Sequence, residues 1–425
     1  MIERIYDKWL NANKKLSTDT RSIEKGGIFL ALKGENFNGN NFAIQALEQG
    51  ALFAVVDEKP TNFEQYKEKL ILVEDCLKTL QDLARFHRLN MPARIICLTG
   101  SNGKTTTKEL IYTALSCEYK VLATEGNLNN HIGVPLTLLN LREDHEFGIV
   151  ELGANHQKEI ELLANIALPD LGYITNFGKA HLEGFGGVEG VIKGKSELYD
   201  FLRIHNKTAL VNQEDFKQIE MSAGIKSIFN FNTELKLETT IPYIGFTYKK
   251  EHYTCHLFGD YNFTNIKAAF SLALYFGINP YLSLEALSNY QPKNNRSQLI
   301  KQDKLEIILD AYNANPSSVT NALEMFSKKA DINSVILGDM LELGTVSQDE
   351  HAQIVEKSEK LDFNFQIFIG PEFMKVKSNA QKKSSYFFET KKDFSNSEIK
   401  SRIWHESNSI LIKGSRGMRM EDLIE

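Results

Sequence analysis

The chain has 425 residues, of which 42% are hydrophobic and 24% charged, a composition typical of an ordinary globular protein. Its formal net charge of −6 argues against a general nucleic-acid-binding protein, which would be basic overall. The length allows about two to four domains, and we expect three.

The N-terminus and the apolar runs argue against secretion and membrane insertion. Residues 1–7 carry charges where a signal peptide needs an apolar core. No apolar run approaches the roughly twenty residues of a membrane span. The cysteines show neither CxxC pairing nor metal-ligand spacing, so we expect reduced thiols in a soluble cytoplasmic protein with no stable membrane insertion.

Residues 1–88 predict a small N-terminal α/β domain. The expected elements are a short strand at 27–34, an amphipathic helix at 42–47 and a buried strand at 51–57. Asp19 and Arg21 lie in the polar turn before the first of these strands. From the residues alone, the favoured interpretation of this pair is an exposed ion pair, which contributes little.

The second segment, 89–292, opens with a predicted phosphate-binding loop. The apolar run 95–98 is typical of a buried parallel strand, and apolar residues recur at helical spacing over 108–115. The sequence Thr-Gly-Ser-Asn-Gly-Lys-Thr-Thr lies between them, at 99–106. Glycines let backbone N–H groups approach phosphate oxygens, and the helix N-terminus adds partial positive charge.

This loop is shorter than the commonest phosphate-loop pattern, which has a glycine where this chain has Leu98. The alternative is a plain strand-to-helix turn with a solvated lysine. Because Gly-Lys-Thr falls where strand meets helix, we favour binding of a nucleoside triphosphate, with Lys104 on its terminal phosphates and the Thr105 hydroxyl on Mg²⁺. The loop residues expected to hold the nucleotide are Gly100, Ser101, Asn102, Gly103, Lys104, Thr105 and Thr106.

Three polar residues further along this segment are candidates for the same site. Glu151 ends a predicted strand, where a carboxylate is a natural Mg²⁺ ligand or simply a strand-end cap. His181 follows the next predicted strand, and the residues leave a metal or phosphate ligand and a satisfied polar group equally open. Lys195 lies on a predicted helix, and the residues alone favour a solvated cation.

Asparagines mark two other places. Asn127, Asn129 and Asn130 lie in a loop at 124–135, where they suit a polar ligand or form a turn cluster. The helix that starts near residue 260 carries Asn262 and Asn265 on one face of its first turn, able to contact a base edge or a ribose, or only to cap the helix. Between these places, 205–256 predicts two or three antiparallel strands.

Residues 293–425 predict a second α/β domain, and 291–296 is the candidate hinge, with Arg296 as a solvated linker arginine. Strands alternating with helices imply a parallel sheet with right-handed crossovers. The predicted strands are 305–310, 335–339, 365–370 and 409–413. Polar residues collect at the ends of these strands, namely Asp310, Asn313, Asp339, Lys413, Ser415 and Arg416.

These motifs resemble, over nearly the whole chain, the Mur ligase family of bacterial cell-wall synthesis. The stretches that carry the resemblance include 18–21, 29–34, 99–106, 126–135, 151–154, 175–182, 195–197, 262–265, 310–316, 337–344 and 413–416. A sibling that adds the third amino acid has an Asp-Asn-Pro-Arg signature, which this chain lacks. Gly338-Asp339-Met340 and Lys413-Gly414-Ser415-Arg416 look like the member that adds the terminal dipeptide.

The resemblance implies an α/β protein of three domains. They are an N-terminal UDP-binding domain at 1–88, a central P-loop ATP-binding parallel sheet at 89–292 and a C-terminal Rossmann-like domain at 293–425. It implies an ATP-dependent amide ligase that joins D-Ala-D-Ala to UDP-N-acetylmuramoyl-tripeptide through an acyl phosphate, with Mg²⁺. The family members are commonly cytoplasmic monomers.

The resemblance also assigns roles to residues, and it reverses the residue-only interpretations of Asp19, Arg21 and Lys195. Lys104, Glu151, His181 and Lys195 would be catalytic, and Thr105, Glu151, His181 and a carbamylated Lys195 would hold metal. Asn262, Asn265, Arg296 and Asp310 would hold the adenosine part of ATP. Asp19 and Arg21 would bind UDP, Asn127, Asn129 and Asn130 the muramoyl part, and Lys413 and Arg416 the acyl phosphate or incoming carboxylate. Tyr261 departs from the family, which usually has histidine there.

Two alternatives stay open at this point. One is another Mur-type amide ligase with a different acceptor, such as a folate glutamate ligase, against which the N-terminal UDP-type motif argues. The other is a P-loop switch that hydrolyses nucleotide to change partners. A switch would not need a second α/β domain with its own polar strand ends.

Overall fold

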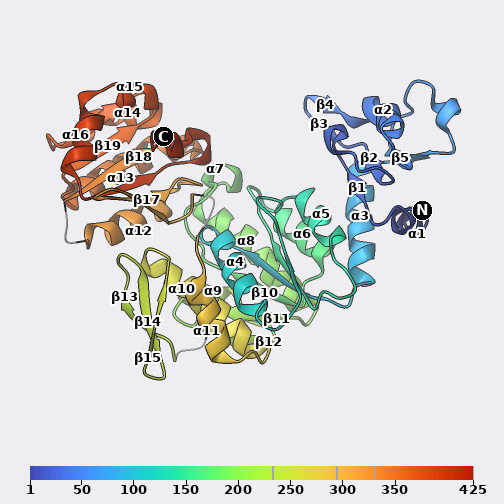
Figure 1. Cartoon of the computed structure of the whole chain (residues 1–425), viewed down its shortest axis with the longest axis horizontal. Helices are drawn as coiled ribbons and strands as arrows, with labels where there is room; N and C mark the ends of the chain where they lie inside the picture. Colours follow the sequence, from blue (N-terminus) through green and yellow to red (C-terminus); the bar gives the residue numbers. More distant parts are fainter. Residues whose placement is uncertain (232–233, 293–294, 330–331, 425) are drawn as a thin grey trace. The chain divides into compact units, whose positions relative to one another are not determined.

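The computed structural model of the chain describes residues 1–231, 234–292, 295–329 and 332–424 (Figure 1). It divides into two compact units. One unit comprises Met1–Cys97, Lys120–Leu152 and Glu161–Leu171. The other comprises Leu98–Tyr119, Gly153–Ile160 and the chain from Gly172 onward. None of the helices in the described ranges is long and apolar enough to cross a membrane.

The N-terminal part of the first unit is a four-stranded parallel sheet in the order β1-β2-β5-β6. Its strands are β1 (Leu16–Ser17), β2 (Ile28–Leu30), β5 (Phe53–Val56) and β6 (Leu70–Leu72), with helices α1 (Ile2–Asn11), α2 (Ala43–Glu48) and α3 (Cys76–Leu89). The predicted α/β character is confirmed. The expected strand at 27–34 is β2 alone, because Lys33–Gly34 (β3) pairs with Phe37–Asn38 (β4) as a separate hairpin.

The central sheet has six strands in the order β12-β11-β10-β7-β9-β8. They are β7 (Arg94–Thr99), β8 (Val121–Ala123), β9 (Phe147–Glu151), β10 (Leu171–Ile174), β11 (Thr208–Val211) and β12 (Ser227–Asn230). The strands β7, β9 and β10 are buried along almost their whole length, as continuous apolar runs predict for a parallel sheet covered on both faces. Helix α4 (Lys104–Leu115) begins directly after the loop that follows β7.

The antiparallel strands expected within 205–256 are only partly as predicted. Three antiparallel strands are present, β13 (Lys236–Thr239), β14 (Ile244–Tyr248) and β15 (Glu251–Cys255). The residues before them, however, form α9 (Phe216–Met221) and two parallel strands of the central sheet, β11 and β12. The buried run at the end of β11 explains the difference, since it is apolar at consecutive positions rather than alternating.

The C-terminal sheet has the order β16-β17-β21-β18-β19-β20. Its strands are β16 (Gln298–Gln302), β17 (Leu305–Asp310), β18 (Asn333–Gly338), β19 (Phe365–Ile369), β20 (Ser385–Phe388) and β21 (Ser409–Lys413). The main helices are α12 (Pro316–Ser327), α13 (Ser347–Lys360) and α16 (Glu398–Glu406) (Figure 1). All pairings are parallel except that of β16 with β17, which is antiparallel.

The register of this sheet sets its polar end. Asp310 pairs with Lys413, and Leu337 pairs with the same lysine from the other side. The loops that follow β17, β18 and β21 therefore leave the sheet at one edge, where polar residues were expected. The predicted strands are confirmed, while β16 and β20, at the two edges of the sheet, were not anticipated. Residues 293–294 of the predicted hinge and domain boundary lie outside the described residues.

A buried histidine in the first unit has a proton position fixed by its neighbours. His87 of α3 is fully buried, with Nε2 3.0 Å from Leu141 O and Nδ1 3.1 Å from Tyr6 Oη. A carbonyl can only accept, so Nε2 carries the proton and Nδ1 accepts from the tyrosine hydroxyl. Burial lowers the pKa of His87 to about 4, so the ring is neutral in the folded protein.

We predict that this ring contributes to the loss of stability in mild acid. The pKa of His87 is lower in the folded protein than in the unfolded chain, where it is near 6.5. The neutral ring therefore contributes its full stability above about pH 6.5, and this contribution is lost as the pH falls toward about 4. The loss should reach about 3 kcal/mol. Thermal unfolding of the wild type and of His87→Gln at several pH values between these limits measures it, because glutamine does not titrate.

The control is the same substitution at His131, whose side chain is exposed. His131→Gln should change the pH dependence of the melting temperature less than His87→Gln does. Equal slopes for the wild type and His87→Gln would show that His87 does not titrate in this range.

Candidate nucleotide and substrate site

The loop between β7 and α4 depends on two glycines. Gly100 has φ +141°, and a Cβ there would lie 2.0 Å from Thr175 Oγ1. Gly103 has φ +78° and immediately precedes α4. A side chain at Gly100 is therefore excluded by contact as well as by conformation. The result is a glycine turn whose backbone opens onto the N-terminus of a 12-residue helix, as an anion site requires.

The segment after β10 holds this loop in place. Thr175 Oγ1 donates to Asn102 O at 2.6 Å, and Asn176 Oδ1 accepts from the Asn102 N–H at 3.1 Å. Ser101 donates from its N–H to Asn176 O at 3.0 Å and from Oγ to Gly178 O at 2.7 Å. Thr175 and Asn176 fall within the family motif at 175–182, and the sequence indicated no role for them. Their contacts with 101–102 show that they fix the loop before any ligand is present.

Lys104, the first residue of α4, turns back over the loop. Its Nζ donates to Gly100 O at 2.8 Å and lies 3.4 Å from Ser101 O. Thr105 and Thr106 are largely buried. The ammonium group thus lies on the loop that would surround the phosphates, close to where a terminal phosphate would need it.

The two asparagines at the start of α10 (Asp260–Tyr275) do not cap that helix. The N-cap is Gly259, and no side chain bonds to the first turn. Instead, Asn262 Nδ2 donates to Phe258 O at 2.8 Å, and Asn265 Nδ2 donates to Asn262 Oδ1 at 2.9 Å. A Cβ on Gly103 would lie 3.1 Å from Asn265 Oδ1, so this amide borders the phosphate loop. The capping alternative is wrong.

Tyr261, which replaces the usual histidine, lies beside this pair. Its hydroxyl is 3.4 Å from Ser297 Oγ, and burial raises its pKa. Its ring occupies the space a Cβ on Gly259 would need.

Lys195 is not the solvated cation that the residues alone favoured. It is fully buried on α8 (Val188–Ile204), with Nζ donating to Ala154 O at 3.1 Å and 4.9 Å from the centroid of the Phe185 ring. Burial of a lysine is costly and points to a specific partner or a chemical modification. Sequence reasoning missed this burial because α8 has many polar residues.

His181 contacts Glu342, which lies in the loop that follows β18 of the C-terminal sheet. Its Nδ1 lies 2.5 Å from Glu342 Oε2 without the geometry of a hydrogen bond, and the proximity of the imidazole lowers the pKa of Glu342. Two further contacts join the central and C-terminal parts of this unit. Lys179 Nζ forms an ion pair with Glu350 Oε1 at 2.5 Å, and Asn315 Nδ2 donates a hydrogen bond of 2.7 Å to Asn102 Oδ1. Glu342 and Asn315 fall within the family motifs at 337–344 and 310–316, and the sequence indicated no role for either residue.

In the first unit, the side chains of Asn129 and Glu151 form a hydrogen bond. Asn129 Nδ2 donates to Glu151 Oε1 at 2.9 Å, and Glu151 is buried at the end of β9. Asn130 Oδ1 accepts from the N–H groups of Ile132 and Gly133, which is the turn-forming behaviour the residues allowed. Asn127 is exposed, and its backbone O accepts from the Asn129 N–H.

The donor chemistry partly suits a magnesium ion. The Thr105 hydroxyl and the Glu151 carboxylate offer the oxygen atoms that Mg²⁺ prefers. No group of three His, Cys, Asp or Glu side chains that could hold a metal occurs among the residues described. An unmodified lysine ammonium does not bind a cation, so Lys195 fits the metal only after conversion to an anion.

In the C-terminal part, two predicted arginines lie near the Tyr312 ring, and two other predicted residues, Lys413 and Asp310, form an ion pair. Arg296 Cζ lies 3.5 Å from the centroid of that ring, and Arg416 Cζ lies 5.9 Å from it. Lys413 Nζ pairs with Asp310 Oδ2 at 2.5 Å and donates to Asn313 O at 3.2 Å. Arg296 is therefore packed rather than a freely solvated linker residue, and its Nε is buried without a hydrogen-bond partner.

In the N-terminal domain, Arg21 and Asp19 form a bidentate ion pair on the surface, which we call the fork. Arg21 Nε lies 3.0 Å from both carboxylate oxygens, and Nη2 lies 2.5 Å from Oδ2. The Arg21 hydrogen bonds lower the pKa of Asp19 to about 2. The pair is exposed, as the residues alone predicted, and Ser17 Oγ donates to Asp19 O at 2.8 Å.

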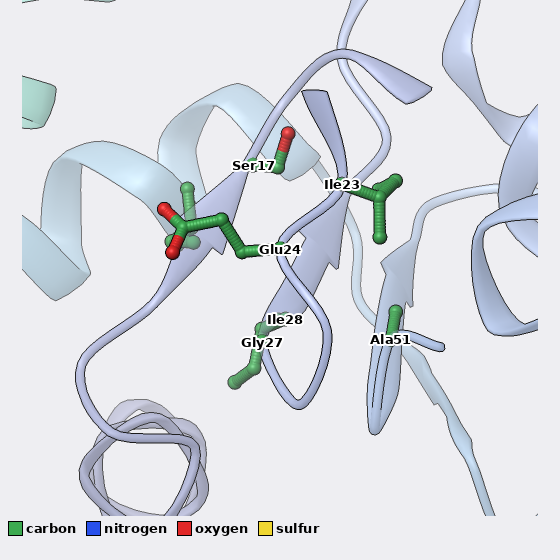
Figure 2. Close-up of a pocket in the computed structure, with 7 residues that line it drawn as sticks. Ser17, Ile23, Glu24, Gly27, Ile28 and Ala51 are labelled. Carbon is green, nitrogen blue, oxygen red and sulfur yellow. The ribbon is translucent and has the colours of Figure 1, made fainter. Parts of the chain in front are cut away.

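A shallow hollow with no room for a water molecule lies beside Ser17, whose hydroxyl donates to Asp19 O. Figure 2 shows Ser17, Ile23, Glu24, Gly27, Ile28 and Ala51 around it, and Leu16 completes the lining. Its walls are apolar apart from Ser17 and Glu24. None of the lining residues belongs to the phosphate loop.

Three family models match the chain in succession. Residues 14–88 match the Mur ligase family catalytic domain, 98–273 the Mur ligase middle domain, and 295–416 the Mur ligase glutamate ligase domain. UDP-N-acetylmuramoyl-tripeptide–D-alanyl-D-alanine ligase of Bacillus subtilis is 34% identical, covering 96% of this chain and 92% of its own length.

Solved structures agree with this comparison. MurF from Acinetobacter baumannii superimposes with a TM-score of 0.85 at 31% identity, over 96% of this chain and 92% of that chain. MurF ligase from Thermotoga maritima in complex with ADP also gives a TM-score of 0.85, at 25% identity, over 97% and 96% of the two chains.

We predict that Gly100→Ala weakens nucleotide binding by at least about tenfold, because its Cβ collides with Thr175 and displaces the loop. Gly277→Ala is the matched control, since Gly277 also has positive φ but has open space around the Cβ position. Both variants should lose about 1–2 kcal/mol of stability from the backbone conformation. Calorimetric titration with a non-hydrolysable ATP analogue measures the difference, and equal affinities in the two variants would contradict it.

Proposed function

The chain belongs to the Mur ligase family, and we propose that it is the ATP-dependent ligase that joins D-alanyl-D-alanine to UDP-N-acetylmuramoyl-tripeptide in peptidoglycan precursor synthesis. The observation that carries the proposal is the phosphate loop on α4, bordered by Asn265, in a chain whose near full-length relatives bear that name. We further propose that the protein acts as a monomer in the cytoplasm.

The reaction has two steps. The terminal carboxylate of the tripeptide attacks the γ-phosphorus of ATP, which forms an acyl phosphate and releases ADP. The amine of D-Ala-D-Ala then attacks the acyl carbon, loses a proton, and inorganic phosphate leaves from the tetrahedral intermediate. The protein therefore has to hold three polar reactants in line and to balance the charge on the transferred phosphoryl group.

The loop residues 100–106 would bind the β- and γ-phosphates through backbone N–H groups, with the Lys104 ammonium on the terminal phosphate. The support is the rigid loop held by Thr175 and Asn176, and the position of Lys104 Nζ over it. Because the loop is ordered by the protein's own hydrogen bonds, little reorganisation is needed when the phosphates arrive.

We propose that Thr105, Glu151, His181 and Lys195 hold Mg²⁺, with Lys195 carbamylated. When bound, Mg²⁺ supplies positive charge to the phosphoryl group during transfer. Carbamylation would replace a buried cation with an anionic oxygen donor, and the burial of Lys195 supports it. Glu151 keeps its carboxylate oriented through Asn129.

The remaining residues would hold the organic parts of the substrates. Asn262, Asn265, Arg296 and Asp310 would contact adenosine, and Lys413 and Arg416 the acyl phosphate or the dipeptide carboxylate. Because Lys413 is already paired with Asp310, its ammonium would have to serve an anion and that carboxylate together. Asp19 and Arg21 would bind UDP beside the hollow of Figure 2, and Asn127, Asn129 and Asn130 the muramoyl part.

We predict that phosphate release from ATP requires both UDP-N-acetylmuramoyl-tripeptide and D-Ala-D-Ala. Lys104→Ala should lower kcat/KM at least about a hundredfold, the size expected for losing a charge-stabilising donor. Lys360→Ala, at an exposed lysine paired with Glu356 on α13, is the control and should be fully active. A phosphate release assay measures both.

Other outcomes of this assay would assign the chain elsewhere. If another amino acid or dipeptide replaces D-Ala-D-Ala, the acceptor is different while the ligase chemistry stands. If phosphate is released with no acceptor at all, the family assignment holds and the proposed substrate is wrong.

We also predict that Arg21→Ala raises the KM for the UDP-linked substrate about tenfold, the effect of losing one charge-assisted hydrogen bond. The kcat and the KM for ATP should not change, because the fork lies apart from the phosphate loop in sequence and touches none of its residues. Steady-state kinetics measures this split. Arg402→Ala, which removes a similar exposed pair with Glu406, is the control, and equal KM values for the two variants would count against a role in binding.

A further inference from the structure

The antiparallel pairing of β16 with β17 brings Arg296 beside Tyr312. Arg296 precedes β16 and Tyr312 follows β17, so both residues lie at the same end of this strand pair. The antiparallel contact continues beyond the strands, where the Ala311 N–H donates to Asn295 O at 2.9 Å. As a result, Arg296 Cζ lies 3.5 Å from the centroid of the Tyr312 ring.

The backbone on either side of Arg296 has an unfavourable conformation. Asn295 has φ +57° and Ser297 has φ +47°, in the left-handed region that residues other than glycine seldom adopt. The Ser297 N–H donates to Asp310 Oδ1 at 3.2 Å, so hydrogen bonds with the end of β17 hold both flanking residues. Such conformations persist only where the surroundings enforce them, and they concentrate at functional sites.

The guanidinium of Arg296 has no acidic partner in the described part of the chain. Its Nε is buried and makes no hydrogen bond, and no carboxylate of the described residues forms an ion pair with it. Lys413, by contrast, is paired with Asp310. Arg416, which also lies near Tyr312, is paired with Glu421. Because Arg296 is half-buried, a charge without a counter-ion is costly there, and this points to an anion that arrives with a ligand.

The contact with Tyr312 occupies the face of the guanidinium and not its donors. At 3.5 Å the group has to lie nearly flat on the ring, because an edge-on approach would bring a nitrogen atom into the ring carbons. The five N–H groups of a guanidinium lie in its plane, and in pairs they match the oxygen atoms of a phosphate. The ring therefore fixes the plane of the Arg296 guanidinium while its N–H groups stay available to an anion.

We propose that Tyr312 is a positioning residue that holds the Arg296 guanidinium flat on its ring, with the N–H groups directed to a phosphate of the nucleotide. The inference rests on the ATP-binding part of the function proposed above, and it names the group that Arg296 meets there. A neutral base or ribose would leave the half-buried charge without a counter-ion. A guanidinium that is held beforehand also loses less side-chain freedom when the phosphate binds.

The first test is calorimetric titration of the full-length chain with ADP and with adenosine, which lacks phosphate. Tyr312→Leu should weaken ADP binding about tenfold, or about 1.4 kcal/mol, a size within the range of a cation–π contact. Its affinity for adenosine should stay as in the wild type. Tyr312→Phe should bind ADP like the wild type, because the ring is retained.

The matched control removes an aromatic ring under a cation elsewhere in the same domain. Trp404 of α16 lies 5.4 Å from Lys400 Nζ, and Trp404→Leu should leave the affinity for ADP unchanged. Melting temperatures check that every variant is folded.

The second test is a double-mutant cycle on ADP affinity. Arg296→Ala should weaken ADP binding at least about tenfold, the effect of losing a charge-assisted contact. Tyr312→Leu should then add no further loss, because the ring acts only through the guanidinium. A ring with a merely structural role would give losses that add.

Unchanged ADP affinity in Tyr312→Leu, or additive losses in the double variant, would overturn the positioning role. An equal loss of affinity for adenosine would overturn the assignment of Arg296 to a phosphate. So would intact ADP affinity with a raised KM for D-Ala-D-Ala, which would assign the guanidinium to the dipeptide carboxylate. If the cycle gives the expected result in a protein that does not use D-Ala-D-Ala, the positioning role stands and the proposed acceptor is wrong.

Discussion

The close approach of Gly100 to Thr175 is the contact on which the rest of the site depends. It joins the end of β7 to the segment after β10, and the missing Cβ lets the threonine hydroxyl reach the loop carbonyl of Asn102. This fixes the N-terminus of α4 and the base of Lys104. The Asn102 side chain then accepts a hydrogen bond from Asn315, the N-cap residue of α12, so the order of the loop extends into that part of the unit.

The C-terminal sheet contributes to the site by register rather than by any single strong interaction. Because β17, β21 and β18 are parallel neighbours, the residues that follow them leave at one edge. Ser415 links all three loops, since it contacts Ala314, Asp339 and Leu341. Arg416 and the carboxylate of Glu342 are thereby carried on a connected set of loops, although they are far apart in sequence.

Much of this architecture could be predicted from the sequence, because its determinants are local. The phosphate loop needs only adjacent residues between a strand and a helix, and the buried C-terminal strands appear as short apolar runs. The contact of Glu342 with His181 and the stacking of Arg296 on Tyr312 could not be found in this way, since contacts between separate loops leave no periodicity in the sequence. The burial of Lys195 was missed because α8 has many polar residues. The edge strands β16 and β20 were missed because they are only partly buried and lack a strong apolar signal.

The fork between Asp19 and Arg21 has a consequence for the kinetics of recognition. A free arginine side chain samples many rotamers and loses that freedom when it meets an anion, which opposes association. In this chain both the Nε and Nη2 groups are already held by the carboxylate, so that entropy is lost during folding instead. An anion that bound at Arg21, as proposed, would therefore meet a guanidinium that is already oriented, and its binding would need no search among side-chain conformations.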